Sequence, residues 1–343
     1  RLDGLPLAIE QAASMVSFLS PSEIEQRLRD CFDVLDSSEG HGNPRHRTLQ
    51  AAIDWSFRML EEPERLLFSR LSVFAGSFSL SGAEAAASDA DLPQASILRL
   101  LRSLVDKSLV VAGTPDDGET RYRMLEAVAA YARKHLSGND ATRGRFFGWA
   151  LGLAKEAETA VVGPDQALWL SKLDKEHSNL LHAIEHGFKK RDERVVDLVY
   201  GLRRFWLRRG YIQDGIGYVA RCLRTFSLAS ARAAQLRNTL GAYYWRRGET
   251  DCARVEFEAS LALLEATGDE RMVAWIVNNL GILSSDSGEY EKACDFHYRS
   301  LRILQHGEDK AATLLTHVNL AMAQVELSRY GEALTHLTDA QHL

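Results

Sequence analysis

The chain has 343 residues, of which 45% are hydrophobic, 26% charged and 8% aromatic, with a formal net charge of −6. No apolar run approaches the roughly 18 residues of a membrane-spanning helix, and no signal peptide is visible, so a membrane protein is excluded and the cytoplasm is expected. The length predicts two or three domains. The four cysteines form no Cys-x-x-Cys pair, so neither a cysteine zinc site nor a disulfide framework is indicated.

The sequence begins RLDGLPLAIEQAA, without an initiator Met. Pro6 lies where a helix should start, and proline is tolerated in a first turn because its missing N–H would be unpaired there anyway. That interpretation explains the proline alone. It leaves open why a turn comes so early, with nothing before it to turn from.

The middle of the chain predicts three helices. The segment HRTLQAAIDWSFRMLEEPERLLFSRLSVFAG contains two helical patterns, the first capped by Thr48 and the second starting at Glu61–Glu64 around Pro63. ASILRLLRSLVDKSLV predicts a third helix with one apolar face. That face consists of Ile97, Leu100, Leu101, Leu104 and Val105.

Two short β-prone runs follow, Leu109–Ala112 and Thr120–Met124, on either side of a Pro-Asp-Asp-Gly turn. This pattern predicts a β-hairpin. Helices closed by a hairpin make a winged helix, which we expect over residues 43–137. The segment EAVAAYARKHL then predicts a helix that leads into the remainder of the chain.

Three later segments repeat at a spacing of 40 residues, beginning at Asn238, Asn278 and Val318. Each has a leucine followed by a small residue, a turn, and a second amphipathic helix with an alanine. The matching residues are Leu240, Leu280 and Leu320, Gly241, Gly281 and Ala321, and Ala253, Ala293 and Ala333. The pattern resembles the tetratricopeptide repeat, in which such residues hold two helices together as a hairpin.

Two degenerate units precede these repeats, one from Tyr200 and one from Gly163. Residues 138–343 are therefore expected to form a tetratricopeptide-like helical solenoid, so the fold class is mainly α. Such stacks bury a core only between neighbouring hairpins, and each end needs a cap or a continuation. We therefore expect the chain to be part of a longer protein, extended at both ends.

The repeat resemblance implies a binding groove. In tetratricopeptide stacks the first helix of each hairpin lines the concave surface, and positions two, five and twelve point into it. Here these positions, with two from the degenerate unit, are Tyr200, Arg208, Gln235, Asn238, Trp245, Trp275, Asn278 and Ser285. Exposed Trp beside Arg and Asn is typical of a binding hot spot for a protein or a small-molecule inducer. Alternatively, Trp245 and Trp275 fill gaps between hairpins.

The order of motifs resembles one family along essentially the whole chain. GLPLA, RHRTLQAAIDWSF, LSVFAGSFSL, LVDKSLV, YRMLEAVAAYA and then the repeats are arranged as in bacterial STAND-class signalling ATPases of the NB-ARC type. These include LuxR-like and antibiotic-regulatory transcriptional regulators. The resemblance implies that residues 1–42 are the end of a helical ARC subdomain, and that the intact protein binds ADP or ATP and can oligomerise.

In that family the GLPLA proline lies against the adenine of the nucleotide, so the resemblance gives Pro6 this role. A Met-His-Asp triplet of the winged helix contacts the ADP phosphate, and its counterparts here are Met124, Leu125 and Glu126. Leu125 cannot hydrogen-bond a phosphate, and Glu126 would repel one. The alternative is structural: Leu125 belongs to the core, and Glu126 is favoured by the helix dipole in a first turn.

Phosphate-binding chemistry is absent from the sequence. There is no G-x-x-x-x-G-K-[ST] loop and no apolar strand that ends in paired acids, so the chain is not expected to be an enzyme by itself. One other motif suggests catalysis: His182-Ala-Ile-Glu185-His186 matches the H-x-x-E-H pattern of some zinc peptidases. A zinc site also needs a third ligand and a cleft, and its segment is typical of a solvated helix.

Winged helices often bind DNA, which is the competing function. Between Arg45 and Leu136 there are 12 basic and 12 acidic residues, whereas binding to phosphates needs a concentrated positive face. The third helix offers Arg99, Arg102 and Lys107, interrupted by Asp106. We therefore expect a sensor fragment of a nucleotide-switched regulator, in which the winged helix covers a nucleotide domain outside this chain.

Overall fold

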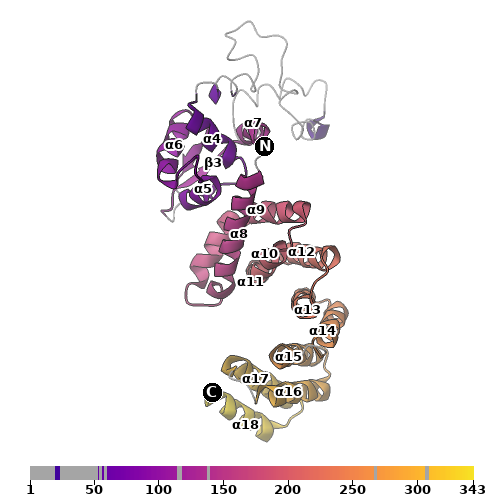
Figure 1. The fold of residues 1–343 in the computed structure, drawn as a ribbon. Coiled ribbons are helices and arrows are strands. Elements are labelled where there is room, and N and C mark those ends of the chain that lie inside the picture. The colour runs from indigo at the N-terminus through magenta and orange to yellow at the C-terminus, as the bar shows by residue number, and fades with distance from the viewer. Residues whose placement is uncertain are drawn as a thin grey trace. The chain divides into compact units, whose positions relative to one another are not determined.

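A computed structural model describes residues 20–23, 53, 56–57, 60–113, 118–136, 140–265, 269–305 and 309–343 (Figure 1). The expected ARC segment, residues 1–42, lies outside the described residues except for 20–23, and so does Pro6. The chain separates into two compact units, Arg1–Leu198 and Val199–Leu343. The expected fold class, a mainly helical chain with a winged helix followed by tetratricopeptide-like repeats, is confirmed.

The first unit contains the winged helix. Its elements are α4 (Glu62–Leu71), β1 (Phe78–Ser79), α5 (Leu80–Ala87), α6 (Gln94–Asp106), β2 (Val111–Gly113), β3 (Arg121–Arg123) and α7 (Glu126–His135). The hairpin of β2 and β3 is antiparallel, as the sequence predicts. A strand that the sequence pattern did not indicate, β1, pairs with the other edge of β3 and gives the order β1-β3-β2.

The start of α4 and the packing of α6 follow the sequence pattern. The backbone N–H of Glu61 donates to the carboxylate of Glu64 over 2.8 Å, so the first turn of α4 satisfies one of its unpaired N–H groups. Helix α6 buries the predicted apolar face, apart from Val105, which is half-buried. This face meets the fully buried Leu67, Phe68 and Leu71 side of α4 in one core.

Three more helices complete the first unit and lead out of it: α8 (Asp140–Ala160), α9 (Gln166–Lys190) and α10 (Val195–Gly201). Helix α8 packs on α5 of the winged helix, and α9 packs on α8. The expected boundary at residue 138 therefore lies within a compact unit, because the winged helix and these helices share contacts.

Buried polar side chains join α9 to the small sheet. Arg121 of β3 forms an ion pair with Glu176 of α9, and both side chains are more than nine-tenths buried. Asn179 donates to the Ser77 carbonyl over 2.8 Å, while its side-chain oxygen accepts from the N–H groups of Ala75 and Gly76 over 2.9 and 3.1 Å. These bonds satisfy groups that would be costly to bury unpaired.

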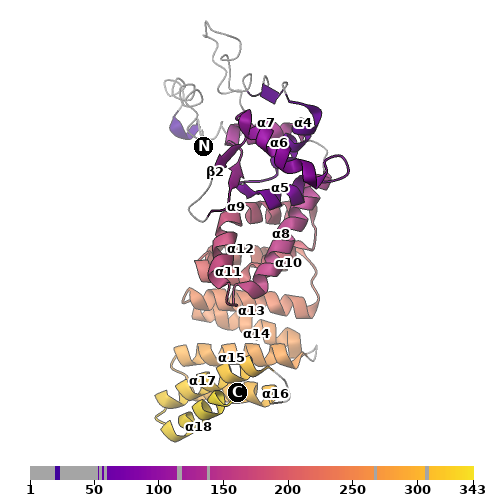
Figure 2. The same cartoon turned by 90° about the vertical axis from the view of Figure 1, so that its left-hand side faces the viewer.

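The second unit is a stack of helical hairpins. It contains α11 (Arg203–Arg209), α12 (Ile212–Thr225), α13 (Ser230–Arg246), α14 (Thr250–Glu265), α15 (Glu270–Asp286), α16 (Tyr290–Leu304), α17 (Lys310–Glu326) and α18 (Tyr330–Gln341). Helices α13, α15 and α17 start at residues 230, 270 and 310, which confirms the spacing of 40 residues. Figures 1 and 2 show the last three hairpins one after another.

Small residues let the two helices of a hairpin approach closely. A Cβ added to Gly241 would lie 2.5 Å from the ring of Phe257, and one added to Gly281 would lie 2.5 Å from the ring of His297. The turn glycine at 248 has φ of 79°, a left-handed conformation that glycine adopts without strain. The sequence repeat therefore encodes the hairpin directly.

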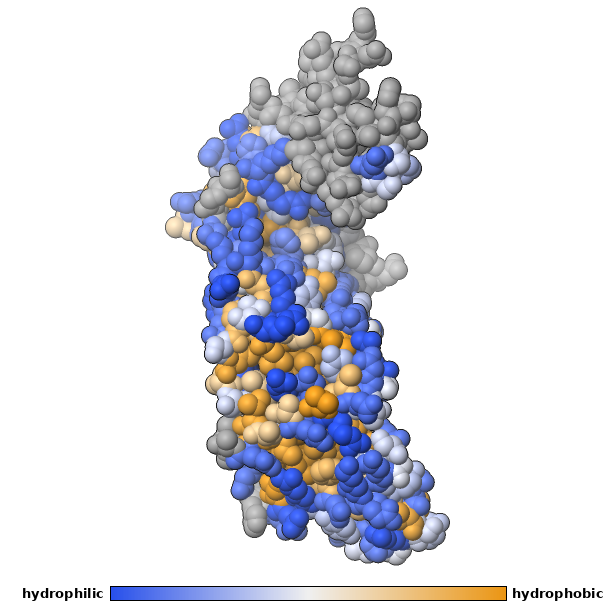
Figure 3. All heavy atoms as spheres, turned by 90° about the vertical axis from the view of Figure 1, so that its right-hand side faces the viewer, coloured by the Kyte–Doolittle hydropathy of each residue, from blue (hydrophilic) through white to orange (hydrophobic). Residues whose placement is uncertain are grey.

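The last hairpin presents apolar side chains to solvent. Leu334 and Leu337 are 66% and 46% exposed, whereas the residues 40 positions earlier, Cys294 and His297, are buried. Cys294 packs against Leu320 and Ala323 of the next hairpin. In Figure 3, hydrophobic side chains interleave with hydrophilic ones along one face of the stacked repeats.

Among the described residues, none of the helices combines the length and apolarity that a membrane crossing requires.

A candidate ligand pocket on the repeat helices

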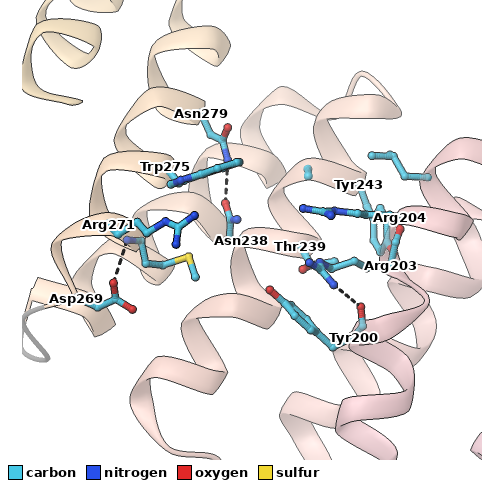
Figure 4. A pocket seen from close by; sticks show the side chains of 13 residues that line it. Tyr200, Arg203, Arg204, Asn238, Thr239, Tyr243, Asp269, Arg271, Trp275 and Asn279 are labelled. Carbon is cyan, nitrogen blue, oxygen red and sulfur yellow. Dashed lines mark hydrogen bonds between the residues drawn. The ribbon is translucent and has the colours of Figure 1, made fainter. Parts of the chain in front are cut away.

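A pocket of about 520 Å³ opens between helices of the second unit. Its walls come from the end of α10 and from α11, α13 and α15, which are the first helices of successive hairpins. Thirteen residues line it: Tyr200, Arg203, Arg204, Leu207, Asn238, Thr239, Ala242, Tyr243, Asp269, Arg271, Met272, Trp275 and Asn279. Figure 4 shows the α11 arginines and Tyr200 on one side, Trp275 and Arg271 on the other, and Asn238 and Thr239 between them.

The α10–α11 wall is basic and aromatic. Arg203 donates to the Tyr200 carbonyl over 2.8 Å, and its guanidinium carbon lies 3.7 Å from the centre of the Tyr200 ring. Tyr243, which is buried, donates from its hydroxyl to the Arg203 carbonyl over 2.9 Å. Burial raises the pKa of Tyr243, so it stays a neutral donor. These contacts hold α11 against α13 and fix this wall.

The α15 wall is organised by Asp309, the residue that caps α17. Its carboxylate accepts from Arg271 over 2.8 Å and from the Trp275 indole over 3.3 Å. Burial opposes ionisation of Asp309, but the Ala312 N–H, Trp275 and Arg271 together lower its pKa below the usual value. The ionised carboxylate orients both side chains that face the pocket.

The floor of the pocket carries a pair of amides. Asn279 donates to the side-chain oxygen of Asn238 over 2.9 Å, which leaves the remaining amide groups for a ligand. Among the lining residues three are arginines and one, Asp269, is acidic. Arginine, aromatic rings and amides in a concave site suit an acidic ligand with apolar or aromatic parts.

The pocket contains three of the eight groove residues expected from the repeat pattern: Tyr200, Asn238 and Trp275. The five others lie elsewhere. Arg208 is exposed at the end of α11, Gln235 accepts from Arg232 over 2.9 Å, and Ser285 is half-buried. They are absent from the lining of this pocket.

Asn278 corrects the expected groove. It is 6% exposed, and its side-chain oxygen accepts from Asn319 of the following hairpin over 3.2 Å. It also lies 3.0 Å from Nδ1 of His297. The packing of α17 against this repeat covers the position, and its neighbour Asn279 lines the pocket instead.

The two tryptophans are partly open. Trp245 and Trp275 are 38% and 37% exposed, so neither ring is fully packed between hairpins. Each indole N–H donates to a carboxylate of the next repeat: Trp245 to Asp286 over 2.6 Å, and Trp275 to Asp309. Only Trp275 of this pair lines the pocket.

Sequence reasoning missed the pocket arginines and Asn279. Arg271, Trp275 and Asn279 follow one another at intervals of four residues, so they lie along one face of α15. Extending the groove prediction along this face would have included all three. Arg203 and Arg204 lie in the degenerate unit, where the repeat register is difficult to assign. The sequence RRFW beside Tyr200 was the available signal.

The winged-helix triplet has an ordinary structural arrangement. Leu125 caps the start of α7 and is buried, with 9% of its surface exposed. Glu126, in the first turn of α7, forms an exposed ion pair with Arg133 over 2.7 Å. Both positions agree with the structural alternative, in which Leu125 belongs to the core and Glu126 lies in the first turn of a helix.

The structure bears differently on the two other candidate functions, a zinc peptidase and a DNA-binding protein. His182 and Glu185 are exposed on α9 and His186 is half-buried, and among the described residues no third ligand completes a cluster with them. On α6, Arg99 and Arg102 are exposed, as DNA binding would require. Lys107 instead donates to both carboxylate oxygens of the buried Glu64, over 2.7 and 2.6 Å.

Family models match both the winged-helix region and the repeat region of the chain. Residues 60–137 match the winged helix-turn-helix domain, and residues 272–341 match the tetratricopeptide repeat. A Mycobacterium bovis protein named "Putative HTH-type transcriptional regulator" is 38% identical over 225 residues, which is 64% of this chain and 25% of that protein. A second Mycobacterium bovis protein, named as uncharacterized, is 44% identical over 138 residues, 40% of this chain and 35% of that one. The match thus spans about a quarter to a third of these relatives.

Two solved structures are similar to this chain at low sequence identity. BtubC from P. vanneervenii matches 58% of this chain and 90% of its own, with 18% identity and a TM-score of 0.46. A Signal Transduction ATPase with Numerous Domains with a tetratricopeptide repeat sensor, from Pyrococcus horikoshii, matches 99% of this chain and 60% of its own, with 16% identity and a TM-score of 0.41.

Proposed function

We propose that this chain is the regulatory and sensor portion of a nucleotide-switched transcriptional regulator. The repeats bind an inducer, and the winged helix acts as a lid on a nucleotide domain outside this chain. A ligand that binds more tightly to an open form, in which the lid has moved away from the nucleotide domain, would shift the population away from the resting, ADP-bound form. The winged helix and repeat matches, and the name of the 38% identical relative, support the regulatory role. The order of motifs supports the nucleotide switch.

The observation that carries the sensor role is the pocket on the first helices of the hairpins. It joins three successive hairpins, so a ligand there contacts residues from Tyr200 to Asn279 at once. Its arginines favour a ligand with carboxylate or phosphate groups, and Trp275 and Tyr200 offer aromatic contacts. We therefore propose that the inducer is an acidic ligand, either a peptide segment or a small molecule.

A matched pair of labelled peptides tests this ligand class. One alternates Glu with Phe, and the other has Gln in place of each Glu; fluorescence anisotropy reports binding to the full chain. The Glu peptide should bind more tightly, and Arg204→Ala should weaken it about tenfold. Arg302→Ala, at an exposed position of α16 outside the pocket, is the control and should change little. Equal affinity of both peptides would contradict the proposed ligand class.

The nucleotide switch would be tested on a longer protein, expressed together with any coding sequence that lies before Arg1. Protein purified under native conditions should release ADP on denaturation, detected by chromatography. Leu125→His would restore the histidine of the family triplet and should raise ADP retention if this turn lies over the phosphate. A longer protein that carries no phosphate-binding loop and no nucleotide would refute the switch.

Direct DNA binding through α6 is the second candidate. The winged helix-turn-helix match and the two exposed arginines, Arg99 and Arg102, favour it. The equal numbers of basic and acidic residues in this region, and the engagement of Lys107 with Glu64, favour the lid. The proposed lid function is therefore preferred.

A further inference from the structure

Two imidazole rings meet in the last hairpin. Nδ1 of His317, on α17, lies 3.1 Å from Nδ1 of His336, on α18. Asp339 is one helical turn beyond His336, with its carboxylate oxygen 3.9 Å from the same Nδ1. The three ligand atoms lie within 4.8 Å of one another. Both histidines are half-buried, whereas Asp339 is exposed.

The contact between His317 and His336 follows from the repeat architecture. The same two positions hold Arg237 and Glu256, an ion pair at 2.9 Å, in the hairpin of α13 and α14. Val277 and Phe296 occupy them 40 residues later. The fold thus places side chains from these positions of the two helices in contact in two of the hairpins, with different chemistry in each. In the last hairpin it brings together two groups that bind transition metals.

The surroundings hold the rings in place. The edge of the Tyr298 ring meets His336, with 5.8 Å between centroids, and the two imidazole centroids are 5.2 Å apart. A neutral imidazole ring offers a lone pair to a metal.

The distances fit a tetrahedral ion. Two nitrogen ligands about 2.0–2.1 Å from tetrahedral Zn²⁺ are about 3.3 Å apart, close to the observed separation of 3.1 Å. The carboxylate oxygen of Asp339 lies 3.9 Å from Nδ1 of His336 and within 4.8 Å of the ligand atom of His317, so it needs to move closer to both nitrogens to complete a third corner. The Asp339 side chain is 53% exposed and can turn. We propose that His317, His336 and Asp339 form a Zn²⁺ site that joins α17 to α18.

Such a site would link metal binding to the stability of the last hairpin. Zn²⁺ would bind the folded hairpin more tightly than the unfolded chain, so it should raise the melting temperature. The fourth position of the ion is left for water. Without metal, the two rings can share a hydrogen bond in which one Nδ1 donates and the other accepts.

Calorimetric titration of the chelator-treated full chain with Zn²⁺ tests the site. We expect one tight site and a rise in melting temperature. The paired substitution His317→Val with His336→Phe copies the residues of the preceding hairpin, and should weaken binding at least about 100-fold while the helix content is kept. A control that replaces His182 and His186 by alanine removes two histidines one turn apart on α9, and it should retain the site.

Two outcomes would overturn the proposal. One is unchanged Zn²⁺ affinity after the paired substitution. The other is no binding by the native chain at about 100 µM Zn²⁺, because structural zinc sites bind more tightly than this concentration requires. If the paired substitution disturbs folding, Asp339→Asn at the exposed position replaces it, with an expected loss of about tenfold. Co²⁺ added to the native chain should then give the intense visible absorption of tetrahedral coordination, and its absence would also contradict the site.

Discussion

Replacing His297 by Phe should make the repeat stack less sensitive to acid. The ring of His297 is fully buried on Gly281, in the place that Phe257 occupies on Gly241 one repeat earlier. Its Nδ1 donates to the side-chain oxygen of Asn278 over 3.0 Å, because an amide oxygen only accepts. Its Nε2 is buried and has no hydrogen-bond partner among the described residues. Phenylalanine therefore fits the site and removes an unsatisfied nitrogen.

The magnitude follows from the pKa of His297, which burial lowers from 6.5 to about 4. The folded state keeps the ring neutral, while the unfolded chain takes up a proton below about pH 6.5. The free energy of unfolding is therefore highest above that pH and falls as the pH approaches 4. Over the whole interval the loss is about 3 kcal/mol, and between about pH 7.5 and pH 5 it is about 2 kcal/mol.

Urea denaturation followed by circular dichroism measures the effect at both pH values. The native chain should lose about 2 kcal/mol more than His297→Phe on acidification. At neutral pH the two should agree within about 1 kcal/mol, because one hydrogen bond is lost and one unpaired nitrogen removed. His342→Gln, at an exposed position, is the control. If both proteins lose stability equally on acidification, another group causes the loss and the reasoning is wrong.

Three further predictions concern the first unit and the chain as a whole. Glu176→Gln should lower the free energy of unfolding by about 3–5 kcal/mol because it leaves Arg121 buried without its charge partner, whereas replacing both residues by Met should cost much less; equal losses would contradict this. The chain alone should show no micromolar ATP binding by calorimetry, since it has no phosphate loop. In anisotropy titrations at physiological salt, DNA should bind weakly and without sequence preference. Nanomolar, sequence-specific binding that is lost with Arg99→Ala and Arg102→Ala would favour the DNA-binding alternative.

The features predictable from the sequence are those that depend on local periodicity. The apolar face of α6 and the 40-residue repeat arise because the same spacing of side chains recurs along one helix or from hairpin to hairpin. The strand β1 has two residues and shows no alternation, so only its pairing with β3 defines it. In the pocket, Trp275 follows the repeat register, whereas Arg203 and Arg204 lie where that register has been lost.

The contact between Arg121 and Glu176 was also beyond local reasoning, because 55 residues separate the partners and each alone resembles a surface charge. Its position has a consequence for the proposed mechanism. The winged helix-turn-helix match ends at residue 137, yet Arg121, Glu176 and Asn179 tie the small sheet to α9, which lies beyond that residue. Breaking these bonds would leave buried charges unpaired, so the winged helix and α9 should move as one body. A displacement of α9 would therefore act directly on the strand that leads into Leu125 and α7, the turn that the resemblance places over the nucleotide.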